Sequence, residues 1–191
     1  MCNLTLRRYF IKCSLFLLVI FSSSVFSYEI GQKLTITLHT NDSESQDIGW
    51  LTILESRDDG FVYDLTLDDD QFETHFLSMA PFKCLESPEK MVCYLPYPYQ
   101  NNRFIAEGNL IDLEYDLLFL HKEPGEYGID PWNGIYYKLK LEAGTISGVL
   151  HDIDLDVIKA PPEKGNLRPI KENMLHKANL NNHWFPKVVI Q

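Results

Sequence analysis

The chain has 191 residues, with 27 acidic and 17 basic side chains, a net charge of −10 at pH 7 and 45% hydrophobic residues. The length fits a single domain, and the hydrophobic content is too high for a disordered chain. The excess of acid argues against nucleic acid as a partner, because a phosphate backbone is repelled by such a surface. An anionic membrane surface is disfavoured for the same reason.

The first 27 residues have the layout of a cleavable signal peptide. Residues 1–12 contain three basic side chains and no acid, residues 13–21 (CSLFLLVIF) are apolar, and small residues lead to Ser27. The apolar run is about half of the ~20 residues that a membrane-spanning helix needs. We therefore predict a secreted protein, periplasmic or extracellular, without an integral membrane span after cleavage. The mature chain then keeps 14 basic and 27 acidic residues, a net charge of −13.

The mature chain starts with a pattern typical of strands. Apolar and polar residues alternate in the runs 34–39, 49–54, 61–67 and 72–76, which are separated by short polar segments. The segment Arg57-Asp58-Asp59-Gly60 carries the Asp-Gly signal of a hairpin. We interpret this region as an antiparallel meander of four strands.

Two cysteines, Cys84 and Cys93, remain after cleavage of the leader, and an even pair in an oxidising compartment favours a disulfide. A turn over 87–90, with Pro88 at its second position, places them directly opposite each other. Such a non-hydrogen-bonded pair has alpha carbons about 4.5 Å apart, within the range of a disulfide. The alternative is two free buried thiols.

The segment 110–121 (LIDLEYDLLFLH) fits two structures. Apolar residues at odd positions alternate with Asp112, Glu114 and Asp116, as they would in a strand. Asn109 as a cap and leucines at helical spacing would also suit a helix. We favour the strand.

A second hairpin is predicted over 135–158, around Glu142-Ala143-Gly144. In its second arm the apolar residues change from even positions, such as Leu150, to odd positions, such as Ile153. This change predicts a β-bulge near His151, unless the odd face belongs to the core throughout.

These elements predict an all-β fold, an antiparallel meander closing into a small barrel or a two-sheet sandwich. We assign this domain to residues 28–160. Residues 161–191 are expected to pack on it as a C-terminal extension, with a short helix over 171–178 as an option.

Aromatic residues on two predicted loops, 94–103 and 124–137, are the candidate binding surface. Such rings offer flat, amphipathic contact area, and an arginine adds a charged group. The alternative is that the rings cover one open end of the barrel. The candidate ligand-binding residues are Tyr97, Tyr99, Arg103, Trp132 and Tyr136.

The candidate catalytic residues are His151 and Asp152, because a carboxylate beside a histidine can tune a general base. The sequence contains no Gly-x-Ser-x-Gly motif, and its six histidines show no zinc-binding spacing. We therefore expect no metal and no cofactor.

Three functions are compatible with these features. The first is a non-enzymatic module that binds a ligand or a protein through the aromatic loops, and we favour it. The second is a secreted hydrolase-type enzyme with the His-Asp site. The third is a structural component of the envelope.

Overall fold

The structure is a computed structural model that describes residues 28–78, 80–159 and 167–191. The predicted leader lies outside these residues. In the described part of the chain, no helix is long and apolar enough to cross a membrane.

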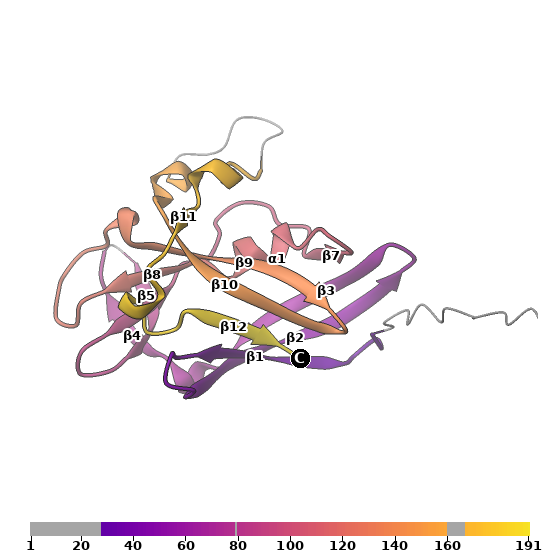
Figure 1. The fold of residues 1–191 in the computed structure, drawn as a ribbon, viewed down its shortest axis with the longest axis horizontal. Coiled ribbons are helices and arrows are strands. Elements are labelled where there is room, and N and C mark those ends of the chain that lie inside the picture. Colours follow the sequence, from indigo (N-terminus) through magenta and orange to yellow (C-terminus); the bar gives the residue numbers. More distant parts are fainter. Residues whose placement is uncertain (1–27, 79, 160–166) are drawn as a thin grey trace, which may run out of the picture.

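One antiparallel sheet contains all the strands of the described residues (Figure 1). Strands make up 47% of the structure and helices 14%, which confirms the all-β class. The order across the sheet is β4-β5-β6-β8-β9-β10-β12-β1-β2-β3-β7, and β11 pairs with β10. The strands are β1 (Lys33–His39), β2 (Ser45–Arg57), β3 (Gly60–Leu67), β4 (Glu73–Phe76), β5 (Pro81–Glu86), β6 (Met91–Tyr94), β7 (Phe104–Ala106), β8 (Phe119–Lys122), β9 (Gly134–Glu142), β10 (Thr145–Ile153), β11 (His176–Lys177) and β12 (Lys187–Ile190).

The sheet is not closed, so the predicted barrel is wrong, and there is one sheet where a sandwich would have two. The edges are β4 and β7. The single α-helix of the described residues, α1 (Ile111–Asp116), contacts β7 and β9. Leu113 in this helix and Leu117 directly after it belong to the main core. Helix side chains, rather than a further pair of strands, therefore complete the core beside the β7 edge.

The first three strands are sequential neighbours, as the alternation predicts, and the hairpin over 57–60 is confirmed. The predicted place of the fourth strand, next to the third, is wrong. Strand β4 pairs with β5 at the far end of the sheet, and β7 occupies the edge of β3. This approach depends on Gly60, because a Cβ there would lie 2.0 Å from the carbonyl oxygen of Ile105.

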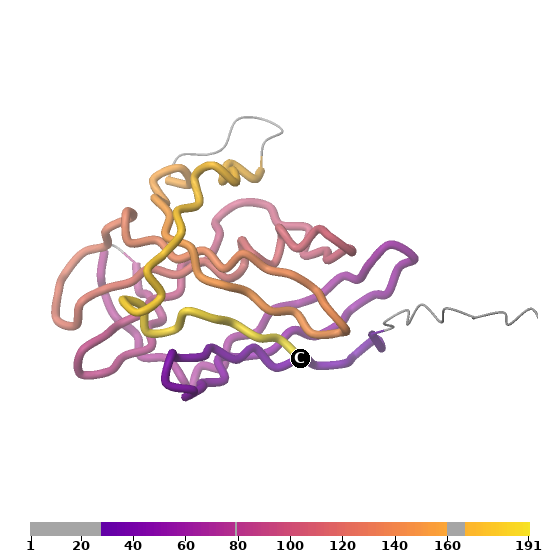
Figure 2. The backbone as a smooth tube through the Cα atoms, viewed as in Figure 1, coloured from indigo at the N-terminus to yellow at the C-terminus, as the bar shows by residue number. Residues whose placement is uncertain are grey.

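The chain's last strand lies inside the sheet. Strand β12 pairs with β10 on one side and with β1 on the other, so the two ends of the described chain are neighbours (Figure 2). The predicted helix over 171–178 is a single 3-10 turn followed by β11. The 3-10 turns are η1 (Asp69–Gln71), η2 (Pro131–Asn133), η3 (Leu155–Ile158), η4 (Glu172–Met174) and η5 (Leu180–Asn182).

The prediction of a strand over 110–121 is wrong for its first half, which forms α1, and only Phe119–Lys122 are extended. The alternation of apolar and acidic residues led to the wrong prediction because it implies one buried and one exposed face. In α1 the three acidic side chains are buried together with Leu113 and Tyr115.

The predicted bulge near His151 is also absent, since β9 and β10 pair without a register shift from Thr145 to Ile153. The apolar positions change because both faces of the sheet are covered. Leu150 lies in the main core, whereas Ile153 lies in a second core that also contains Tyr115 and Tyr136.

The predicted disulfide is confirmed. Cys84 on β5 lies directly opposite Cys93 on β6, with the alpha carbons 3.9 Å apart, and both side chains are fully buried. The Ser87 amide donates to the Lys90 carbonyl oxygen at 2.8 Å and closes the turn of this hairpin. The bridge therefore joins the two strands three residues from that turn.

Candidate functional site

His151 and Asp152 are adjacent on β10 but form no hydrogen bond with each other in the described structure. Successive residues of a strand point to opposite faces. Nδ1 of His151 lies 3.1 Å from the carbonyl oxygen of Val149. The Asp152 carboxylate lies 2.9 Å from Nε2 of His183 instead. The structure thus contains a His-Asp pair, but its histidine is His183, 31 residues away in sequence.

His183 follows η5, and its side chain is only 12% exposed. Burial lowers the pKa of His183, against the opposing attraction of Asp152, and the charges of His121 and Lys90 act in the same direction as burial. The rings of His121 and His183 are 6.1 Å apart. The Nδ1 atoms of both rings are buried and have no hydrogen-bond partner among the described residues.

The four predicted aromatic ligand-binding residues lie in different environments. The Tyr97 ring packs edge-on against Tyr99 at 5.5 Å and against Tyr115 at 4.7 Å, and Tyr115 in turn lies 6.4 Å from Tyr136. Tyr136 is buried in the second core. Trp132 stands apart on η2, with 70% of its surface exposed. The structure therefore joins three of the rings through Tyr115 and leaves Trp132 open to solvent.

Arg103 faces carboxylates of its own chain. Its Nε lies 3.3 Å from Asp116, and its Nη1 contacts Asp64. Its backbone has φ = +50°, a left-handed conformation that non-glycine residues adopt infrequently, and the carbonyl oxygen accepts from the Tyr63 amide at 3.0 Å. Arg103 thereby connects β3 to the buried acid at the end of α1.

The three acids of α1 are buried, and each has a defined set of partners. Asp116 accepts hydrogen bonds from the Tyr63 hydroxyl at 3.0 Å and from Asn101 at 2.6 Å. Burial nevertheless raises the pKa of Asp116, against the effect of Arg103. Glu114 accepts from the Leu139 amide at 2.9 Å and from the Tyr136 hydroxyl.

Asp112 pairs with Arg168, whose Nε and Nη2 both donate to the same carboxylate oxygen. The guanidinium also lies over the rings of Tyr97, at 5.4 Å, and Tyr115, at 5.0 Å. Arg168 thus fixes the C-terminal segment to α1. With all three acids satisfied in this way, we interpret the α1 network as structural.

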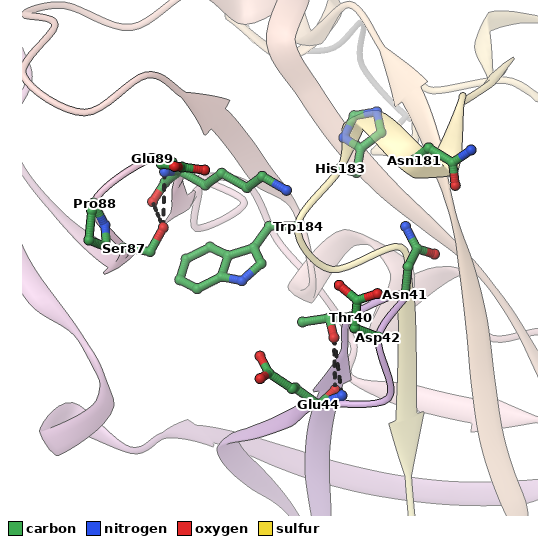
Figure 3. A pocket seen from close by; sticks show the side chains of 11 residues that line it. Thr40, Asn41, Asp42, Glu44, Ser87, Pro88, Glu89, Asn181, His183 and Trp184 are labelled. Atoms are coloured by element: carbon green, nitrogen blue, oxygen red, sulfur yellow. Dashed lines mark hydrogen bonds between the residues drawn. The ribbon is translucent and has the colours of Figure 1, made fainter.

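The described structure has a groove of about 580 Å³ between two turns (Figure 3). One wall is the β1–β2 turn, and the other is the tip of the disulfide hairpin. Figure 3 shows the indole of Trp184 between them, with His183 at one side. We call this cavity the Trp184 groove. It is lined by Thr40, Asn41, Asp42, Glu44, Ser87, Pro88, Glu89, Lys90, Asn181, His183 and Trp184.

Both walls of the Trp184 groove are held by local hydrogen bonds. The Ser87 hydroxyl accepts from the Lys90 amide at 3.0 Å and donates to its carbonyl oxygen at 3.1 Å. Across the groove, the Thr40 hydroxyl accepts from the Glu44 amide at 3.1 Å. The indole is fixed from behind by Phe185, stacked at 4.4 Å. The groove is therefore built from ordered parts.

Neither Trp184 nor His183 was among the residues predicted from sequence. Their segment, NNHWF, carries no motif, and its neighbours in the groove come from distant parts of the chain. The only available signal was a tryptophan among polar residues outside a predicted strand. The described residues contain no group of three or more His, Cys, Asp or Glu side chains arranged to hold a metal ion.

Comparison with protein-family models, with curated proteins and with solved structures found no match to this chain.

Proposed function

We propose that the protein is an exported, non-enzymatic binding module whose ligand lies in the Trp184 groove. The observation that supports this most directly is the groove itself. Ligand sites are typically concave and largely preformed, and a small number of placed polar groups give them specificity. Here an indole lies between two hydrogen-bonded turns, and one turn belongs to the hairpin of the Cys84–Cys93 disulfide.

The proposed export rests on the leader sequence and agrees with the disulfide, since such bonds persist mainly in oxidising compartments. A stable disulfide at the base of one wall also suits a binding site. It limits the conformations that the 87–90 turn can adopt, and preorganised walls lower the entropic cost of binding.

The aromatic loops offer a second surface for the same function. Trp132 is 70% exposed and Tyr127 is 81% exposed, both within the 124–137 loop. Tyr97 and Tyr136, by contrast, are engaged in the second core. The two surfaces are distinguished by comparing variants at Trp132 and Trp184.

The hydrolase alternative now depends on the His183–Asp152 pair, because His183 lines the groove. A nucleophile next to it is not evident. The Ser87 hydroxyl, which lines the same groove, is bonded to the backbone of Lys90. In the described structure, no hydroxyl group is hydrogen-bonded to the His183 ring, and we therefore favour binding over catalysis.

The test is a screen of the purified protein against a library of sugars, amines, amino acids and short peptides by ligand-observed NMR. We expect hits whose signals are lost with Trp184→Ala and retained with the matched variant Trp132→Ala. Hits lost only with Trp132→Ala would move the site to the aromatic loops. Conversion of a hit to product would establish an enzyme, and an absence of hits would favour the structural role.

A further inference from the structure

Building on the proposed function, we infer that the Trp184 groove binds an organic ammonium group, the amine of a polyamine or of a lysine side chain. In this arrangement the ammonium lies against the Trp184 indole, and the carboxylates of Asp42, Glu44 and Glu89 surround it.

The first argument is the aromatic surface. A cation is attracted to the face of an aromatic ring, and tryptophan is the best of the aromatic side chains for this purpose. Phe185 stacks on the Trp184 indole at 4.4 Å with 26° between the planes. The partly exposed remainder of the indole lines the groove, between the two turns (Figure 3).

The second argument is charge. Three carboxylates line the groove, and none of them forms an ion pair with the residues that the structure describes. Lys90 is the one permanent cation of the lining. Burial lowers the pKa of His183 and favours its neutral form. The groove therefore has a negative balance that a cation would compensate.

The third argument is the kind of hydrogen-bonding group left free. The hydroxyls of Thr40 and Ser87 are bonded to backbone groups, and the Asn41 amide donates to the Leu180 carbonyl oxygen at 2.8 Å. Among the groups that remain, three are carboxylate acceptors, and Lys90, the Asn181 amide and the Trp184 indole N–H are donors. An ammonium offers three donors and no acceptor, so it matches the three carboxylates.

The same chain shows this contact elsewhere on its surface. The ammonium of Lys33 lies 4.7 Å from the centre of the Trp50 ring. In the groove, an amine from outside the chain would take the corresponding position on Trp184.

The experiment is isothermal titration calorimetry of the purified protein with spermidine and with Nα-acetyl-lysine amide, at low and at high salt. Maltotriose and inorganic phosphate serve as neutral and anionic probes. We expect amine binding that weakens at high salt, because the carboxylates are exposed. Stronger binding of spermidine would indicate a polyamine, and stronger binding of the lysine amide would indicate a peptide side chain.

Trp184→Ala is expected to weaken amine binding about 2- to 30-fold, the range of a cation–π contact. The triple variant D42N/E44Q/E89Q should weaken it further and remove most of its salt dependence. The matched controls are Trp132→Ala and D58N/E107Q/E126Q, which removes the same number of exposed acids that do not line the groove. Circular dichroism verifies the fold of each variant.

Equal amine affinity in wild type and in the groove variants would overturn the inference, and so would the absence of amine binding. If maltotriose or phosphate binds in a Trp184-dependent manner and the amines do not, the groove remains the ligand site and only the ammonium assignment fails. Failure of the proposed function is a different result, in which the library screen yields no Trp184-dependent ligand.

Discussion

Removal of the Cys84–Cys93 disulfide should destabilise the protein by an amount that follows from the size of the loop it closes. The cysteines are nine residues apart. The chain-entropy relation for a loop of this length gives about 2.6 kcal/mol at 25 °C. With a urea m-value of about 2 kcal/mol/M for a domain of this size, the unfolding midpoint of C84A/C93A should fall by about 1.3 M.

The assay is urea unfolding followed by circular dichroism, with wild-type protein reduced under denaturing conditions and refolded in reductant as the matched control. The reduced protein and C84A/C93A should have similar midpoints, because both lack the loop constraint. A midpoint of C84A/C93A within about 0.3 M of that of the oxidised wild type would refute the reasoning. Both sulfurs are buried, so we also expect the native disulfide to resist reductant until the protein unfolds.

Three further predictions concern the charged networks. Arg168→Ala leaves the buried Asp112 without its partner and should lower the free energy of unfolding by about 3 kcal/mol in urea titration, whereas Arg168→Lys should recover part of the loss. Burial raises the pKa of Asp116, so the contribution of Asp116 to stability is complete at low pH and is lost as the pH rises through the folded-state pKa. Relative to wild type, Asp116→Asn should therefore gain stability from about pH 4 upward. A difference in melting temperature that does not change with pH would contradict this prediction. Burial lowers the pKa of His183, so the contribution of His183 to stability is complete above the unfolded-state pKa of about 6.5 and is lost as the pH falls. In thermal melts, the stability difference between wild type and His183→Gln should therefore be largest near pH 7.5 and shrink toward pH 5.

The position of the disulfide was predictable because hairpin register is a local property. Pro88 and the flanking alternation locate the turn, and the turn determines which residues face each other. The hairpins over 57–60 and 142–145 follow from the same local rules. Sheet order does not, because β4 and β7 are chosen as edges by contacts between distant segments.

The helix α1 shows where pattern reading failed. Alternation of Asp112, Glu114 and Asp116 with apolar residues indicates a half-exposed strand only if the acids face water. Here the acids are satisfied inside the protein, and two of their partners, Tyr136 and Arg168, lie 22 and 56 residues away in the chain. A one-dimensional pattern carries no information about such partners.

The candidate site residues were likewise predicted from local sequence features, whereas their partners depend on the tertiary structure. Tyr97 and Tyr136 were selected for being aromatic, and the structure places both beside Tyr115 in the second core. Asp152 was selected as the partner of His151, but the pleat of β10 turns it toward His183.

The sequence alone determined the all-β class, the local hairpins and the disulfide, because each depends on residues close together in the chain. It also predicts the acidic character of the mature protein. Only the tertiary structure decided that β12 enters the middle of the sheet, that the sheet stays open beside α1, and that Trp184 meets two turns to form a groove. These features depend on packing between segments that are not neighbours in the chain, such as β10 with β12 and β12 with β1, and there burial of both sheet faces outweighs local preference.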